Sequence, residues 1–195
     1  MDEDKDKELY KEFIEGRIEA IDELIKMYKN DLIYFIYKYV RDFHLAEDIS
    51  QEVFVYLLQH KENYDFKYSL KSYLYTIAKS RALNCIKFRR KIIFIEDISE
   101  TAISEEVDIE NEICREDQKR LVKGAMKKLK KDYRIVIQLI DYEGLTYEET
   151  AIIMKKSISQ IKALVHNARK RLKIFLNEEL KREVKHNEVC GTTHK

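Results

Sequence analysis

Residue types that shape β-structure are scarce or missing in this sequence. Its 195 residues include no proline, no tryptophan and only four glycines, and the asparagine–glycine and aspartate–glycine pairs that form tight hairpins do not occur. Hydrophobic residues make up 45% and charged residues 37%, a balance typical of a folded chain rather than a disordered one. The composition argues against β-sheet and predicts an all-α protein.

Cysteines and long apolar runs are also scarce. The three cysteines lie far apart without CxxC spacing, which fits a reducing compartment. No apolar run approaches the ~18 residues of a membrane span, and the acidic N-terminus lacks the apolar core of a signal peptide. We therefore expect a cytoplasmic protein with no direct membrane insertion.

One spacing near the C-terminus suits a metal ion. His186, Cys190 and His194 recur every four residues. Three ligands in a tail expected to fray are weak grounds for a site, and the neighbouring carboxylates Asp48 and Glu52 have no histidine at ligand spacing. We expect no metal and no other cofactor.

Acidic side chains are absent from two long stretches. Residues 67–91 hold eight Lys or Arg and no acid, and residues 155–176 hold seven and no acid, whereas residues 92–117 hold ten acids and one Arg. A basic stripe on one element is typical of phosphate binding. Two stripes joined by an acidic tether predict a protein that grips one nucleic acid in two places. Either stripe alone could instead be a solvated helix face.

Apolar periodicity predicts helices along most of the chain. Apolar residues recur at three- and four-residue steps over residues 8–41, 45–59, 69–91, 113–131 and 133–142. Gly16 is expected to break the first segment and Gly144 to close the last. The side chains expected to face the core in the second segment are those of Ile49, Val53, Phe54, Leu57 and Leu58.

The predicted architecture is two small helical domains joined by an acidic linker. Residues 92–110 are acidic, β-branched and poor in helix formers, so we expect them to be extended. The predicted divisions are a first domain at 1–91, a flexible linker at 92–112, a second domain at 113–181 and a C-terminal tail at 182–195.

Two capping boxes lie eleven residues apart in the second domain, Thr146 with Glu149 and Ser157 with Gln160. They predict a short helix, a tight turn and a long helix, which is a helix-turn-helix. Ile158, Ile161, Val165, Ala168, Leu172 and Phe175 are expected to face inward. The outward side chains suit a DNA major groove, since Lys and Arg hold phosphates or guanine and Asn or Gln reads adenine. An ordinary helical hairpin with a cationic surface is the alternative.

These segments resemble, in order, the extracytoplasmic-function class of bacterial RNA polymerase sigma factors, over about residues 8–176. AEDISQEVF at 46–54 is similar to the region-two motif A-E-D-I-x-Q-E-x-F, and SYLYTIA at 72–78 to the motif around W-L-Y-x-I-A. EGLTYEETA at 143–151 is similar to the region-four motif E-G-L-S-Y-E-E-I-A, and HNARKRL at 166–172 to H-R-A-R-x-x-L.

The resemblance implies a sigma factor that binds core RNA polymerase and directs promoter-specific initiation, by melting the minus-ten element and recognising the minus-thirty-five element. It implies docking on the clamp helices of the largest subunit through Asp48, Gln51 and Glu52. The implied minus-ten contacts are Tyr64, Phe66, Tyr73, Lys79, Ser80 and Asn84. The implied minus-thirty-five contacts are Tyr147, Gln160, Lys162, His166, Asn167, Arg169 and Lys170.

The resemblance also implies promoter DNA and an anti-sigma factor as partners, and no small-molecule substrate. Tyr64 and Phe66 are implied to stack on unpaired bases, a contact of roughly 1–3 kcal/mol each. Some positions depart from the family pattern: Tyr73 replaces a tryptophan, Ser80 an asparagine and Asn167 an arginine. Lys155 stands where the helix-turn-helix turn usually has glycine. Either the lysine is left-handed, at a cost of about 1 kcal/mol, or the turn differs from the family's.

Three other functions fit parts of the sequence. A one-component helix-turn-helix regulator would leave residues 46–54 and the first basic stripe without a role. An RNA-binding or adaptor protein would use the basic faces alone. A helical enzyme would need a nucleophile–base pair or a glycine-rich phosphate loop, and the sequence has neither, so we expect no enzyme activity.

Overall fold

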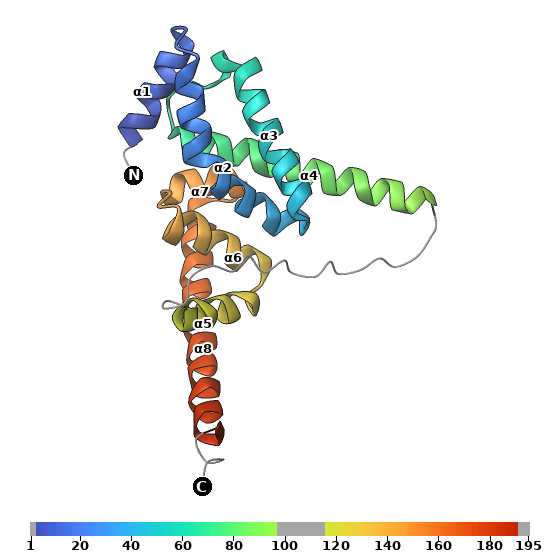
Figure 1. Ribbon diagram of the computed structural model, residues 1–195, viewed down its shortest axis with the longest axis vertical. Coiled ribbons are helices and arrows are strands. Elements are labelled where there is room, and N and C mark those ends of the chain that lie inside the picture. The colour runs from blue at the N-terminus through green and yellow to red at the C-terminus, as the bar shows by residue number, and fades with distance from the viewer. Residues whose placement is uncertain (1–2, 97–115, 191–195) are drawn as a thin grey trace. The chain divides into compact units, whose positions relative to one another are not determined.

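The computed structural model describes residues 3–96 and 116–190 (Figure 1). All regular secondary structure in these residues is helical, which confirms the predicted all-α class. The chain divides into two compact units, one built from helices α1 to α4 and the other from α5, α6, η2 and α8. In these ranges no helix is both long enough and apolar enough to cross a membrane.

The N-terminal unit packs three helices around α2. Its elements are α1 (Glu3–Ile14), α2 (Glu19–Val40), α3 (Phe43–Gln59), the single turn η1 (Lys61–Asn63) and α4 (Leu70–Glu96). Helix α2 contacts α1, α3 and α4, and its buried stripe explains this central place. The largest fully buried side chains of the unit are Tyr10, Leu24, Tyr28, Leu32, Phe35, Ile36, Leu57, Leu70, Leu74 and Tyr75.

The helix boundaries of this unit follow local chemistry. Gly16 has a φ of 110° and separates α1 from α2, as predicted. Arg41, with a φ of 58°, ends α2 and donates its N–H to the Tyr37 carbonyl at 2.9 Å. Asp42 then begins α3, because its carboxylate accepts a hydrogen bond from the Leu45 N–H at 3.1 Å.

Two predictions for this unit are wrong. Leu58 does not face the core and is 41% exposed, because the buried stripe of α3 ends on Leu57. The linker does not begin at residue 92, because α4 continues to Glu96 (Figure 1). Extending a formed helix costs far less than starting one, so a few β-branched residues do not stop it. The predicted linker from 97 to 112 lies outside the described residues.

The C-terminal unit packs α5 (Glu116–Lys127) and α6 (Lys131–Ile137) against α8 (Ile158–Cys190). A π-turn, η2 (Gln138–Tyr142), extends α6, and α7 (Tyr147–Met154) precedes α8. Gly144 has a φ of 72° and closes the π-turn, where the Leu145 N–H reaches the Leu139 carbonyl at 2.9 Å. The buried apolar side chains include Ala125, Leu129, Ile135, Val136, Leu139, Ile161, Val165 and Ala168.

Helix α8 is longer than predicted. The sequence places a tail from residue 182, but α8 continues to Cys190 and extends past α5 (Figure 1). Residues 177–190 are rich in Glu and Lys, which have high helix propensity. The side chains of His186, Cys190 and His194 lie outside the described part of the structure. In that part, no cluster of His, Cys, Asp or Glu side chains could hold a metal ion.

Candidate functional site

Helix α3 carries an exposed polar stripe. Asp48, Gln51 and Glu52 are all exposed, and their spacing of three and four residues places them on one face. The opposite face is buried through Ile49 and Val53. The structure therefore brings the three predicted polymerase-binding residues together on the solvent side of α3.

Two apolar side chains continue this stripe. Val55 is 48% exposed and Leu58 is 41% exposed, and they follow Glu52 at steps of three residues. Apolar side chains beside a polar rim are typical of protein–protein interfaces. Sequence reasoning missed Val55 and assigned Leu58 to the core, although their register with Glu52 could have indicated this face. Asp48, Gln51, Glu52, Val55 and Leu58 form what we call the α3 docking face.

An ion pair connects the α3 docking face to α4. Nη1 of Arg81 lies 2.8 Å from Oε2 of Glu52. The Arg81 guanidinium also lies 5.3 Å from the centre of the Tyr56 ring, within cation–π range. The predicted polymerase-binding stripe and the first basic stripe therefore share a direct contact.

The aromatic loop between η1 and α4 is more buried than predicted. Tyr64 is only 4% exposed, and its phenol donates a hydrogen bond to the Tyr68 carbonyl at 2.6 Å. Its ring packs on Phe66 and Tyr73, so its faces are not open to a base. The prediction that Tyr64 stacks on an unpaired base is therefore wrong for this conformation.

Phe66 and Tyr73 are each half-buried beside Tyr64. Phe66 has a φ of 58°, in the left-handed region that a bulky side chain rarely adopts. Burial raises the pKa of the Tyr73 phenol above its ordinary value, with a smaller effect from Tyr56. Tyr68, which sequence reasoning did not select, is the more exposed ring, and the Lys67 ammonium lies 5.5 Å from its centre.

Helix α4 presents part of the predicted minus-ten set on one face. Ser80 and Asn84 are exposed and follow Tyr73 by seven and eleven residues, which places all three on the same side of the helix. Lys87 extends this face by a further turn and is also exposed. Lys79 is half-buried and lies about 100° around the helix from Ser80, so it does not share the face.

Both predicted capping boxes are present. The Thr146 N–H donates to the Glu149 carboxylate at 3.0 Å, and the Glu149 N–H donates back to the Thr146 hydroxyl at 3.2 Å. Ser157 and Gln160 repeat the pattern, with the Ser157 N–H bound to Gln160 Oε1 at 2.9 Å. Lys155 has a φ of 55°, so of the two alternatives for the helix-turn-helix turn the structure has the left-handed lysine.

The outward face of α8 is exposed and cationic. Lys162, His166, Asn167 and Lys170 are all exposed along it, as predicted. The Lys162 ammonium lies 6.0 Å from the centre of the half-buried Tyr147 ring, which joins this lysine to α7. Ser159 and Ala163 are exposed on the same face and were missed because neither is charged. An alanine there can contact a thymine methyl group.

Two residues of α8 differ from their predicted roles or settings, and a third was not predicted. Arg169 binds Asp141 of the π-turn through two nitrogens, with Nε 3.2 Å from Oδ2. The hydrogen bond to Asp141 raises the pKa of Arg169. The two contacts brace α8 against the π-turn while the arginine still faces solvent. Ile158 is 41% exposed and not inward-facing, because it occupies the first turn of the helix. Arg171, missed by the sequence, is exposed and has no acidic partner among the described residues.

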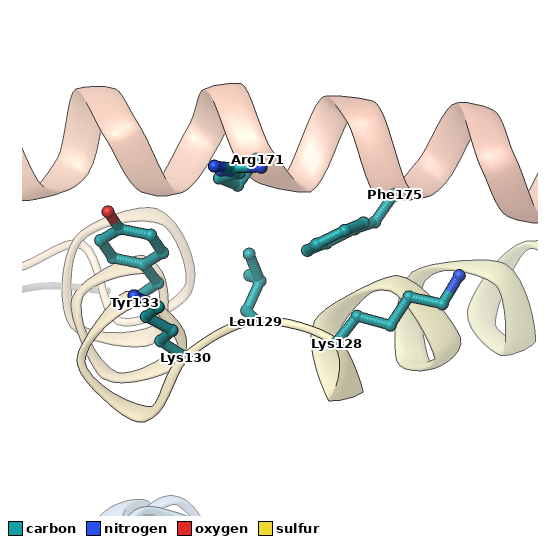
Figure 2. A pocket seen from close by; sticks show the side chains of 6 residues that line it. All are labelled: Lys128, Leu129, Lys130, Tyr133, Arg171 and Phe175. Atoms are coloured by element: carbon teal, nitrogen blue, oxygen red, sulfur yellow. The ribbon is translucent and has the colours of Figure 1, made fainter.

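Arg171 lines a pocket of about 250 Å³ between the α5–α6 connection and α8. Figure 2 shows Leu129 and Phe175 pointing toward each other inside it, with lysines and Arg171 around them. Lys128 lies 5.8 Å from the Phe175 ring centre and 2.6 Å from the Glu179 carboxylate. The pocket is therefore an apolar crevice with a cationic rim.

The helical units, the helix-turn-helix and the basic faces define a DNA-binding protein built from two helical modules. The Sigma-70 region 2 family matches residues 24–92, and the Sigma-70 region 4 family matches residues 119–172. The two matches follow the order of the sequence motifs and together cover more than half of the chain. The chain belongs to the extracytoplasmic-function class of sigma-70 RNA polymerase sigma factors. The matches to both regions favour a sigma factor over a one-component regulator.

Relatives of known identity agree along most of the chain. The ECF RNA polymerase sigma factor SigM of Bacillus subtilis is 29% identical over 158 residues, which are 81% of this chain and 96% of that protein. The RNA polymerase sigma factor YlaC of the same bacterium is 25% identical over 157 residues, which are 80% of this chain and 91% of that protein.

Solved sigma-factor structures share the fold. The sigma factor RpoE of Bartonella quintana, solved with the anti-sigma factor NepR, gives a TM-score of 0.62 at 23% identity and covers 80% of this chain and 96% of its own. CnrH, solved with the cytosolic domain of CnrY, gives a TM-score of 0.61 at 19% identity and covers 89% of this chain and 98% of its own.

Proposed function

We propose that this sigma factor divides its work among three surfaces. The α3 docking face binds the clamp helices of core polymerase, the aromatic loop and α4 open the minus-ten element, and α8 reads the minus-thirty-five element. In this division, α1 to α4 form the region-two domain and α5 to α8 form the region-four domain. The observation that carries the proposal is that one chain combines an exposed acidic and apolar face with two separate basic faces.

The docking face suits a basic protein partner. Val55 and Leu58 supply apolar area, while Asp48 and Glu52 supply negative charge around it. Apolar contact supplies affinity, and charge complementarity supplies orientation and speed of encounter. This mixture distinguishes the α3 docking face from an ordinary solvated helix side.

The minus-ten surface combines the exposed loop aromatics with the polar face of α4. Phe66 and Tyr68 are the loop rings that retain exposure, and Tyr64 supports them from inside. Ser80 and Asn84 offer hydrogen-bonding groups beside the cationic Lys87. Stacking platforms next to positive charge are the usual means of holding unpaired bases and their phosphates.

The minus-thirty-five surface uses the outward face of α8. Lys162 and Asn167 can reach base edges in a major groove, and Lys170 can reach a phosphate. Arg171 lies toward the flank of the helix and suits the DNA backbone. Arg169 acts mainly as a brace through Asp141, so we assign it no base contact.

We also propose that the chain pairs with an anti-sigma factor in the cytoplasm. The sigma factor RpoE compared above was solved with the anti-sigma factor NepR, which motivates the assignment. Sigma factors act by binding and positioning, and we propose that this one has no catalytic activity of its own. No cofactor enters this function.

A transcription assay tests the proposal. Core polymerase mixed with this protein and fragments of its source genome should give discrete transcripts from a shared promoter sequence. Lys162→Ala should reduce their yield, whereas Lys26→Ala on the exposed side of α2 should not. Only non-specific, end-initiated RNA would contradict the proposal. Specific DNA binding without co-purification of core polymerase would favour the one-component regulator.

A further inference from the structure

Helix α1 reaches the aromatic loop that precedes α4. Tyr10 on α1 is 0% exposed, and its phenol donates a hydrogen bond to the Lys61 carbonyl at 2.9 Å. The two residues lie 51 positions apart in the sequence. Since a buried phenol needs a polar partner, this bond ties the first helix to the start of the loop.

The Tyr10 ring also packs on the loop itself. Its centre lies 5.3 Å from Tyr64, edge to face, and 6.1 Å from Phe66. Tyr64 in turn lies 4.6 Å from Phe66 and 5.3 Å from Tyr73 of α4. These separations fall within the attractive range for aromatic pairs. Tyr10, Tyr64, Phe66 and Tyr73 therefore form one aromatic cluster across α1, the loop and α4.

The cluster holds a residue in an unfavourable conformation. Phe66 has a left-handed φ of 58°, which persists in a bulky residue only when its surroundings hold it. Tyr10 packs on its ring, and the Lys11 ammonium lies 5.8 Å from the ring centre. The Asp65 carboxylate fixes the turn by accepting the Lys67 N–H at 3.0 Å. Two of these supporting side chains come from α1.

We propose that Tyr10 is a positioning residue for promoter opening. It holds Phe66 and the loop in one conformation, so that the loop meets an unpaired DNA base without first having to order itself. The inference rests on the proposed function, which assigns this loop to the minus-ten element. Helix α1 precedes residues 24–92, so the anchoring contact comes from outside the segment that the region 2 family matches.

Binding of single-stranded DNA by the holoenzyme tests this assignment. The probe is a labelled oligonucleotide with the non-template minus-ten strand of a promoter mapped in the transcription assay. Tyr10→Phe keeps the ring and removes only the bond to Lys61, so it should weaken binding by roughly threefold to tenfold, the range for one buried hydrogen bond. Tyr10→Leu, which also removes the ring, should weaken it further. Both variants should keep the wild-type affinity for core polymerase and for minus-thirty-five duplex.

Two controls separate positioning from general destabilisation. Tyr75→Phe alters another buried phenol of α4, whose ring packs on Phe35 at 4.7 Å, and should not weaken oligonucleotide binding even if it lowers the melting temperature. On a series of abasic oligonucleotides, the Tyr10→Phe penalty should disappear when the captured base is missing.

The outcomes separate the two proposals. Three results would overturn the positioning role alone. The first is wild-type oligonucleotide affinity in Tyr10→Phe, and the second is an equal Tyr10→Phe penalty on every abasic oligonucleotide. The third is an equal loss of oligonucleotide affinity in Tyr75→Phe. Failure of the wild-type holoenzyme to bind the strand would overturn the minus-ten assignment, and the role of Tyr10 with it.

Discussion

Arg81 of α4 and Glu52 of α3 form an ion pair, with Nη1 and Oε2 2.8 Å apart. The Glu52 side chain is 58% exposed, so water screens the pair and it contributes little to folding stability. The carboxylate therefore remains available to a basic surface of the polymerase. We expect that Glu52, on binding such a surface, would release Arg81 on the helix that we assign to promoter DNA.

The acidic part of the α3 docking face gives the first prediction. Asp48→Lys combined with Glu52→Lys should weaken core binding by roughly tenfold or more, because like charges across an interface are strongly unfavourable. The free energy of unfolding should change by only about 0.5 kcal/mol, as for most exposed substitutions. Titration with labelled core polymerase and thermal unfolding measure the two quantities. Glu8→Lys on the exposed side of α1 is the matched control. A large stability loss with normal core affinity would show a structural role instead.

The apolar part of the same face gives the second prediction. Val55→Thr keeps the shape of the side chain and replaces a methyl group with a hydroxyl, and Leu58→Gln replaces apolar area with an amide. Each should lower core affinity by roughly threefold to tenfold through lost apolar burial, with little change in melting temperature because both side chains are exposed. Leu57→Gln at the adjacent buried position should instead unfold the unit. Normal core affinity in both exposed variants would remove Val55 and Leu58 from the interface.

The outward face of α8 gives the third prediction. Lys162→Ala and Asn167→Ala should each cost roughly 1–3 kcal/mol in binding to the minus-thirty-five duplex if they contact bases. Arg169→Ala should leave duplex binding near the wild-type value and should lower the stability of the C-terminal unit by no more than about 1 kcal/mol, because the two-nitrogen contact that it removes is partly exposed. Fluorescence anisotropy with duplex DNA and thermal unfolding distinguish the two effects. The assignment fails if Arg169→Ala loses duplex binding at unchanged stability while Asn167→Ala binds normally.

The left-handed turn before α8 gives the fourth prediction. Lys155→Gly should stabilise the protein by roughly 1 kcal/mol, since glycine adopts a φ of 55° without the steric penalty of a side chain. Lys156→Gly, one position later and without a positive φ, should destabilise it. Chemical denaturation of the two variants beside the wild type measures both changes. Equal losses in the two variants would mean that the turn stores no strain at Lys155.

The buried Tyr10 phenol gives a prediction at alkaline pH. Burial raises the pKa of Tyr10, whereas in the unfolded chain the phenol ionises near its ordinary value of about 10. The stability that this group contributes is thus fully present below pH ~10 and falls as the pH rises further, because the unfolded state releases the proton first. Tyr10→Phe has no phenol to ionise at this position, so its stability lacks this pH dependence. The difference in free energy of unfolding between wild type and variant should therefore narrow above pH ~10. Parallel stability curves would contradict the prediction.

Local chemistry made part of this architecture predictable. The capping boxes at Thr146 and Ser157 and the break at Gly16 all depend on residues a few positions apart, and the structure has each of them. The burial of Tyr64 was not predictable in this way. Its ring packs on Tyr10, 54 positions earlier, and no local pattern encodes that contact.

Helix periodicity predicts which face of a helix is buried better than it predicts where the buried face ends. Leu57 and Leu58 are adjacent and equally apolar, yet one is buried and the other exposed. The boundary between them depends on how closely α2 and α4 approach α3, which is a property of the assembled unit. The end of α4 was misplaced for a related reason, since helix propagation continued past the residues where sequence composition changed.

The Ser157 capping box has a consequence for the promoters themselves. Reading an adenine with glutamine requires both the oxygen and the nitrogen of the amide, and Oε1 of Gln160 already accepts the Ser157 N–H. The amide of Gln160, the group in the first turn of α8 best suited to reading a base, is thus engaged in capping the start of the helix. Aligned target promoters should therefore carry little sequence information at the edge of the minus-thirty-five element that this turn faces. The conserved bases should lie where Lys162, His166 and Asn167 enter the groove.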